Sequence, residues 1–381
     1  MSEMNPNLLD RLLQHPLLKR VIDFVSRPRN VGLRLAAGGV AILIAAAAGG
    51  FAFDLAYVDP NNGTRLSFKS GEGAPAMVIW TAVGVGVILA SVGALVAIYD
   101  FIITRRREAR KTIVIVELRG LHSGPGTSPT PAAIGLPPFG AQNVLIDFRP
   151  QAEGKLVDPD VAVHKLDALK PTIAAAIAGR DEADVTVAIG GLAATPVLFL
   201  AGALMDDEAH VLLYDWDREQ RAWRSLDGMD DGQRVLPVNY SALPVGAKRV
   251  VLALSLSYAV DEDALQRRFG ADAAIVHMRI DEPRVNQFWS TTKQEAITKS
   301  FIETVQQLLH RGIQRLDLVI AAPASLSIRL GMAYDKRLLP AIAVHQYEKS
   351  TAAGYPWALR MPTHGFARAA VERAGHKGTS A

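Results

Sequence analysis

Near the end of the chain, a strand-like segment runs directly into a helix, and the residues at the junction are small or carry a hydrogen-bond donor. The segment LDLVIAAPASLSIRLGMAYD begins at Leu316, passes through Pro323 and enters the helix near Ser325, with Arg329 one turn later. In α/β proteins a helix N-terminus that follows a strand presents free N–H groups, which hold phosphates. Pro323 suits the first helical turn because it lacks an N–H, Ser325 can cap or donate, and Arg329 adds a cation. The junction carries no catalytic group, so its residues predict anion binding.

An earlier segment repeats this layout. The sequence VTVAIGGLAATPVLFLAGALMD also passes from a strand through a small-residue turn into a helix, and the turn contains Gly190, Gly191 and Thr195. Another apolar run follows each of the two segments. The repeated order predicts two Rossmann-like halves that meet near residues 236–248.

Polar and aromatic residues also occur at other predicted strand ends. Ser255, Ser257 and Tyr258 end the run VVLALSLSY, and Trp289 and Lys293 flank the start of a later helix. Ligands of open α/β sheets bind at the carboxyl ends of the strands, and aromatic rings stack on nucleobases, so these residues are predicted to share a ligand site. The alternatives are ordinary turn capping for the serines, a solvated helix face for Arg329 and a core position for Trp289.

A different chemistry is suggested by Asp215 and Asp217 in the motif YDWD. A D-x-D motif after an apolar strand holds the divalent ion of many glycosyltransferases, and membrane-anchored glycosyltransferases are common. Aspartates at strand ends also cap turns, and the following REQRAW reads as a polar hairpin turn. A membrane-anchored nucleotide-sugar glycosyltransferase therefore stays open as an alternative.

Composition excludes several other functions. The chain has 41 basic and 38 acidic residues and no cysteine. Near-neutral charge is unlike that of a nucleic-acid-coating protein, and the lack of cysteine excludes disulfides, thiolate metal sites and cysteine nucleophiles. P-loop, nucleophile-elbow, zinc-protease and dinucleotide-binding motifs are missing from the sequence. We therefore expect no catalytic residue, no metal site and no cofactor.

Two long segments near the N-terminus carry no charge. They run from Leu35 to Phe53 and from Ala74 to Tyr99, and each is long enough to cross a hydrocarbon core of about 30 Å. Because basic residues are enriched on the cytoplasmic side of membrane spans, the basic flanks predict a hairpin with both ends in the cytoplasm. A signal peptide is the alternative for the first segment. The flanking basic residues are Lys19, Arg20, Arg27, Arg29 and Arg34 before the first span, and Arg105, Arg106, Arg107, Arg110 and Lys111 after the second.

Small residues recur at four-residue spacing in the second span, at Gly86, Ala90 and Ala94 and again at Gly93 and Ala97. Small residues let helix backbones approach closely inside lipid. They predict either association between neighbouring hairpins or close packing of the two helices within one hairpin.

From residue 112 onward, apolar runs of strand length alternate with amphipathic segments, which is typical of an α/β fold with mostly parallel sheets. The predicted strands are TIVIVEL, NVLIDF, DVTVAIGG, HVLLYDWD, RVVLALSLS, AAIVHMRI, LDLVIAAP and AIAVHQYE, and the predicted helices include residues 160–178, 196–205, 262–269 and 292–311. A loop rich in Gly, Pro, Ser and Thr, over residues 121–141, reads as a flexible insertion.

Two of these segments, ALSLSYAVDEDAL and AAPASLSIRLGMAYDKRLLPAIAVHQYE, the latter followed by Tyr355 and Leu359, resemble the SAVED domain. That domain is a fusion of two CARF-like Rossmann folds that senses cyclic oligonucleotides in bacterial anti-phage signalling (CBASS) and in CRISPR-associated defence. The N-terminal hairpin is similar to the two-transmembrane effector that is fused to SAVED in some CBASS operons.

The resemblance implies a fold, a function and a location. The fold is an N-terminal transmembrane α-hairpin followed by two fused CARF-like halves. The chain is then a membrane-bound effector of the bacterial inner membrane that binds a cyclic di- or trinucleotide supplied by a cognate nucleotidyltransferase, forms a homo-oligomer or filament and disrupts the lipid bilayer in abortive infection. A membrane-tethered scaffold that binds no nucleotide is a further alternative. The expected boundaries are a cytoplasmic segment at 1–34, the hairpin at 35–104, the first half at 112–240, the second half at 245–362 and a C-terminal tail at 363–381.

Overall fold

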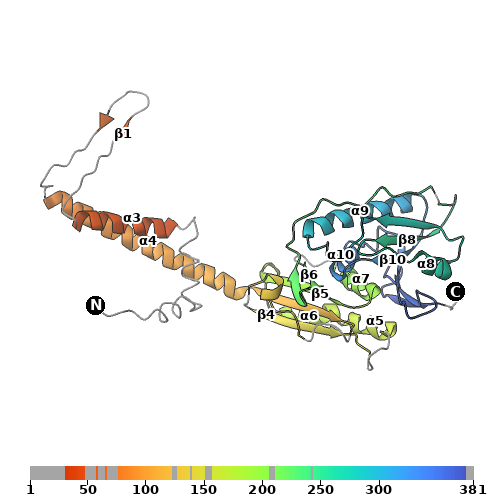
Figure 1. Cartoon of the computed structure of the whole chain (residues 1–381). Helices are drawn as coiled ribbons and strands as arrows, with labels where there is room; N and C mark the ends of the chain where they lie inside the picture. Colours follow the sequence, from red (N-terminus) through yellow and green to blue (C-terminus); the bar gives the residue numbers. More distant parts are fainter. Residues whose placement is uncertain are drawn as a thin grey trace. The chain divides into compact units, whose positions relative to one another are not determined.

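The computed structural model describes residues 31–47, 57–58, 65–66, 76–121, 127–137, 140–150, 157–205, 211–241 and 243–374. The chain divides into two compact units, Met1–Ala109 and Arg110–Ala381. Figure 1 shows both units and labels many of their helices and strands.

The N-terminal unit contains two helices, α3 (Val31–Ala47) and α4 (Ala76–Arg110), and a short antiparallel ladder of β1 (Tyr57–Val58) with β2 (Arg65–Leu66). The helices touch through small residues. A Cβ atom added to Gly39 would lie 2.3 Å from the backbone nitrogen of Ala90, and one added to Gly93 would lie 2.2 Å from that of Ala36. Four of the small residues of the second predicted span, Gly86, Ala90, Gly93 and Ala97, therefore pack the two helices of the hairpin against each other, whereas Ala94 is exposed.

The outward surface of this hairpin is apolar. Within the described residues, Met77–Arg110 is the helix that is long and apolar enough to cross a membrane, and α3 is a shorter apolar helix. The rest of the first predicted span, residues 48–53, lies outside the described residues. The exposed apolar side chains include Leu35, Val40 and Ile44 on α3, and Trp80, Val85, Ile88, Val92, Leu95 and Ile98 on α4.

The first sheet of the C-terminal unit has the strand order β4-β3-β5-β6-β7. The first four are parallel neighbours, and β7 pairs antiparallel with β6. Helix α7 connects β5 to β6, and α5 and α6 precede β5. The bounds are β3 Thr112–Arg119, β4 Ala141–Asp147, α5 Pro159–Asp167, α6 Leu169–Ile177, β5 Val185–Leu192, α7 Thr195–Leu204, β6 Val211–Asp217 and β7 Ala222–Ser225, with short 3-10 turns η1 at Ala132–Ile134 and η2 at Glu182–Asp184.

The second sheet repeats this order. It reads β9-β8-β10-β11-β12, with β13 added beyond β12. The neighbours from β9 to β11 are parallel, and β12 and β13 are antiparallel. The bounds are β8 Arg249–Ser255, α8 Glu262–Phe269, β9 Ile275–Arg279, α9 Thr291–His310, β10 Arg315–Ala321, α10 Ala324–Met332, β11 Ala341–Gln346, β12 Trp357–Arg360 and β13 Ala370–Arg373. The α/β fold with two Rossmann-like halves and mostly parallel sheets is thus confirmed.

The structure differs from the sequence prediction at several elements. The single helix predicted over residues 160–178 is two helices, because Pro171 lacks an N–H and its ring clashes with the carbonyl of Asp167, where α5 ends. The sequence prediction also lacks the short strands β7, β12 and β13, and β13 lies within the segment that was expected to be a tail. Part of the predicted flexible insertion is packed against the first sheet, since Ile134 is buried there and the Trp223 indole donates to the Thr127 carbonyl at 3.1 Å.

The two halves meet where α7 crosses α10. A Cβ atom on Gly202 would lie 2.0 Å from the carbonyl oxygen of Ile328, and one on Gly331 would lie 2.0 Å from that of Phe199. Each glycine thus admits the backbone of the other half's helix. One hydrophobic core contains residues of both halves, which makes the sheets and these two helices a single packed body.

Candidate functional site

The N-termini of α7 and α10 point to the carboxyl ends of strands in the opposite half. The backbone N–H of Thr195, at the start of α7, donates to Gln346 Oε1 at the end of β11, over 3.0 Å. The backbone N–H of Ser325, in the first turn of α10, donates to Asp215 Oδ2 in β6, also over 3.0 Å. Each half therefore caps a helix of the other half. This is possible because β11 and β6 end beside the point where α7 and α10 cross.

A pocket of about 200 Å³ lies beside these helix starts. Its walls come from both halves and are rich in aromatic rings. Asp215 is the acidic residue and Arg218 the cation among the residues that line it. The first half contributes Leu121, Leu192, Ala193, Thr195, Leu198, Asp215, Trp216 and Arg218, and the second contributes Ser257, Tyr258, Val285, Asn286, Phe288, Trp289, Ala322, Pro323 and Ala324.

The aromatic walls are held in place by contacts behind them. Trp216 packs edge-on against Trp223, with ring centroids 5.2 Å apart, and the Arg224 guanidinium lies 4.8 Å from the Trp289 ring centroid. The Gln294 side-chain amide donates to the Phe288 carbonyl at 2.8 Å. Tyr258 is 54% exposed, so its ring is accessible to a ligand without rearrangement of the core.

Several of the residues predicted from the sequence line this pocket: Thr195, Ser257, Tyr258, Trp289 and Pro323. Gly190 and Gly191 do not line the pocket. Each lies in close contact with the backbone of a neighbouring strand. A Cβ atom on Gly190 would lie 2.4 Å from the Tyr214 carbonyl oxygen, and one on Gly191 would lie 2.1 Å from that of Leu118. The sheet requires glycine at both positions.

Three other predicted site residues have their polar groups directed to protein partners. Ser255 Oγ accepts from the backbone N–H of Val260 at 3.0 Å and thereby closes the turn after β8. Ser325 Oγ accepts from the Gln294 amide at 2.9 Å. Arg329 Nε donates to Gln294 Oε1 at 3.2 Å, and this guanidinium also pairs with Glu295. These residues stay predictions as ligand contacts, and in the described structure they support the wall of the pocket.

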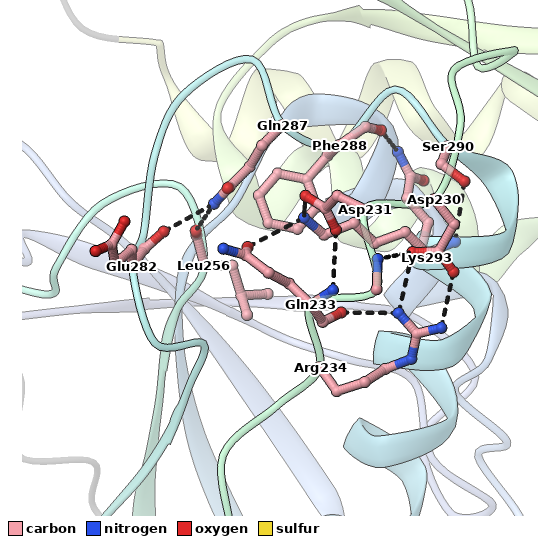
Figure 2. Close-up of polar contacts among 12 residues, drawn as sticks. Asp230, Asp231, Gln233, Arg234, Leu256, Glu282, Gln287, Phe288, Ser290 and Lys293 are labelled. Carbon is pink, nitrogen blue, oxygen red and sulfur yellow. Dashed lines mark hydrogen bonds and ion pairs between the residues drawn. The ribbon is translucent and has the colours of Figure 1, made fainter.

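Lys293, the remaining predicted residue, has a fully buried side chain. Its ammonium donates to Asp231 Oδ2 at 2.6 Å and to Gln233 Oε1 at 3.3 Å, and it lies 4.8 Å from the Phe288 ring centroid. Figure 2 shows this group, with the neighbouring pair of Asp230 and Arg234. The ion pair ties the connector between the halves to the start of α9, directly behind a pocket wall.

Asp231→Asn should lower the free energy of unfolding by about 1–3 kcal/mol, because it leaves a buried ammonium with neutral acceptors only, while the 42% exposure of the Asp231 side chain lets water screen part of the loss. Asp230→Asn is the matched control: its partner Arg234 is exposed, so loss of this ion pair should change stability little. Lys293→Met should be tolerated better than Asp231→Asn, and the double variant should be no less stable than Lys293→Met alone. Denaturant titration of the full chain in detergent measures these differences, and an Asp231→Asn variant of native stability would contradict the assignment.

The same pair makes stability depend on pH. Burial alone would raise the pKa of Asp231, but the hydrogen bonds from the Lys293 ammonium and the Gln233 N–H, together with the positive charge of Lys293, outweigh it, and the pKa lies below its ordinary value. A carboxyl with a lowered folded-state pKa stabilises the fold above its unfolded pKa of about 3.9, and this contribution is lost as the pH falls through the lowered value.

The two aspartates of the D-x-D motif have separate structural partners. Asp217 Oδ1 accepts from the backbone N–H groups of Glu219 and Gln220, both at 2.9 Å, and so caps the β6–β7 turn. Asp215 is buried, and burial raises its pKa although the Ser325 and Trp216 N–H groups act in the opposite direction. In the part of the chain that the structure describes, no group of three or more His, Cys, Asp or Glu side chains is placed to hold a metal ion.

The order of the strands, the repeated strand-helix units and the pocket between them describe a fused pair of Rossmann-like sensor folds. A family model, "SMODS-associated and fused to various effectors sensor domain" (SAVED), matches residues 168–361. The chain belongs to the SAVED family. A second model, "SAVED-fused 2TM effector domain", matches residues 11–163, so the chain joins a SAVED sensor domain to a two-transmembrane effector domain of antiviral defence.

Solved structures similar to this SAVED chain include the Cap4 SAVED/CARF-domain containing receptor of Acinetobacter baumannii with the cyclic trinucleotide 2'3'3'-cAAA, at 12% identity and a TM-score of 0.44 over 75% of this chain and 60% of that one. They also include the Cap4 receptor of Moraxella osloensis, at 12% identity and a TM-score of 0.41 over 74% of this chain and 60% of that one. The SAVED chain thus spans 60% of the length of these receptors. No curated protein matched.

Proposed function

We propose that this chain is a membrane-bound effector that senses a cyclic oligonucleotide in its SAVED domain and then oligomerises and disrupts the bacterial inner membrane. The observation that carries this proposal is the pocket between the two halves. It offers aromatic rings on which nucleobases stack, a cation in Arg218 and hydroxyl donors in Thr195, Ser257 and Tyr258. The pocket presents no paired catalytic carboxylates or activated nucleophile among its lining residues, and we propose a binding function without catalysis.

The hairpin supports the effector half of the proposal. Its apolar exterior suits a lipid surround, and a run of arginines at residues 105–107 follows the long apolar part of α4, as expected where a span ends in the cytoplasm. We propose a multi-pass topology with both termini cytoplasmic, which would place the sensor in the compartment where a nucleotidyltransferase makes its signal. A ligand drives assembly only to the extent that it binds the assembled state more tightly than the free one.

The direct test is ligand-dependent thermal unfolding of the full chain in lipid nanodiscs. A panel of cyclic di-, tri- and tetranucleotides, including 2'3'3'-cAAA and 3'3'3'-cAAA, should contain at least one that raises the melting temperature, since a ligand at 100 times its Kd adds about 2.7 kcal/mol. A panel without any stabilising member would favour the membrane-tethered scaffold.

Tyr258→Ala should weaken binding of the stabilising cyclic nucleotide by roughly tenfold to a hundredfold, because stacking on an aromatic ring contributes about 1–3 kcal/mol per base. The ring is half exposed, so its removal opens no core cavity. Phe366→Ala is the matched control, because Phe366 is 59% exposed and lies outside the pocket. Isothermal titration of both variants checks the prediction, and equal affinities would place the ligand elsewhere.

A further inference from the structure

The pocket has few groups that can bind a phosphate. The backbone N–H groups of Thr195 and Ser325, which the sequence suggested for that role, already donate to Gln346 and Asp215. The acidic residue of the lining, Asp215, adds negative charge at the same place. An anion would be repelled here, so the interior of the pocket is better suited to a neutral group than to a phosphate.

The Asp215 carboxyl is held rigidly but retains capacity to accept. Its Oδ1 accepts from the Trp216 N–H at 2.8 Å and its Oδ2 from the Ser325 N–H at 3.0 Å. The Ser325 hydroxyl also hydrogen-bonds to Asp215, and a carboxylate offers about four lone-pair positions, so about one remains after these bonds. The Asp215 residue is 6% exposed and lines the pocket, whose other lining residues include the aromatic Tyr258 and Trp289, so a base stacked on one of these rings could present its edge to the carboxyl.

We propose that Asp215 accepts a hydrogen bond from the exocyclic amino group of a nucleobase seated in this pocket, and so selects bases that carry an amino group. Adenine, guanine and cytosine carry such a group, whereas hypoxanthine and uracil present a carbonyl or a hydrogen in its place. A carbonyl oxygen that faced the Asp215 carboxylate could not form a hydrogen bond with it, because both groups are acceptors. Arg218, which is exposed on the lining, then pairs with a phosphate outside the base pocket. This inference rests on the proposed function and adds the identity of the group that reads the base.

The test uses pairs of cyclic trinucleotides that differ in the amino group. Cyclic tri-adenylate and tri-guanylate are each compared with cyclic tri-inosinate, and cyclic tri-cytidylate with tri-uridylate, by titration into the full chain in nanodiscs. The tightest amino-bearing ligand should bind roughly tenfold to a hundredfold better than its deaminated partner, as expected for a hydrogen bond to a charged group. Asp215→Asn should reduce this ratio to about threefold or less, because the amide loses acceptor capacity and gains a donor that suits a carbonyl.

Asp217→Asn is the matched control. It makes the same chemical change two residues along β6, at a side chain that caps a turn and does not line the pocket, so the ratio should stay at its wild-type value. A ratio within one protein cancels any effect of the substitution on folding. Equal binding of the paired ligands to the wild type, or an unchanged ratio in Asp215→Asn, would overturn the base assignment alone. If none of these ligands nor any other cyclic oligonucleotide bound, the proposed function would fail with it.

Discussion

Gly93→Leu should abolish the ligand-triggered leakage of dye from liposomes that carry the full chain, whereas Gly84→Leu should leave it unchanged. The two glycines lie on the same helix and receive the same apolar side chain, so both variants should insert. They differ in what the new side chain meets. A Cβ atom on Gly93 would lie 2.2 Å from the Ala36 backbone nitrogen, while one on Gly84 has nothing within 4 Å.

The physical reason is that helices in lipid are held together by close van der Waals contact, because lipid is as apolar as the side chains. A leucine at Gly93 forces α3 and α4 apart and removes that contact. Gly39→Leu should act in the same way from α3, with Gly38→Leu as its control, since Gly39 approaches Ala90 and Gly38 has nothing within 4 Å. Ligand affinity should be unchanged in all four variants. Leakage that survived in Gly93→Leu, or was lost in Gly84→Leu, would show that contacts outside the hairpin are the ones that matter.

The sequence was sufficient to predict the main strands and helices of the SAVED domain, because apolar runs and amphipathic periods are local signals. It also predicted that two half-repeats meet, from the similarity of the segments around α7 and α10. The short strands β7, β12 and β13 escaped prediction because each has four residues, which is too short for a clear pattern of alternation. For the small residues of the second span, the sequence left two alternatives, and the structure shows the packing of α3 on α4 within one hairpin.

For the candidate site, the rule that ligands bind at the carboxyl ends of strands, together with the helix starts that follow them, predicted Thr195, Ser257, Tyr258, Trp289 and Pro323, all of which line the pocket. The same rule applied to the end of β6 would have added Trp216 and Arg218, which were missed because that motif was considered for metal binding.

The sequence could not predict which residues far apart in the chain are hydrogen-bonded to each other. The contact between Asp215 and Ser325 spans 110 positions of the chain, and the one between Lys293 and Asp231 spans 62. A serine or lysine at the start of a helix looks alike in sequence whether its partner is a ligand or another side chain.

Gly331→Ala should lower the free energy of unfolding of the SAVED domain by about 3 kcal/mol, the upper part of the range for overpacking a tight contact. In an isolated helix this substitution would be favourable by up to about 1 kcal/mol. Here the added methyl group would lie 2.0 Å from the Phe199 carbonyl oxygen, and a backbone atom cannot move aside unless α7 and α10 separate. Gly365→Ala is the matched control, because its Cβ atom would have nothing within 4 Å, and it should change stability by under about 0.5 kcal/mol.

A double variant tests whether the two halves depend on one contact. Gly202→Ala should cost about as much as Gly331→Ala, because its Cβ atom meets the Ile328 carbonyl at the same 2.0 Å distance from the other side. The double variant should cost clearly less than the sum, since a single separation of the helices relieves both clashes. Chemical denaturation of the full chain in detergent, followed by tryptophan fluorescence, measures all three. Additive losses would mean that each glycine is needed for a separate local reason. If the double variant loses less stability than the sum of the single variants and also binds ligand more weakly, the crossing of α7 and α10 is the contact that holds the two halves of the pocket together.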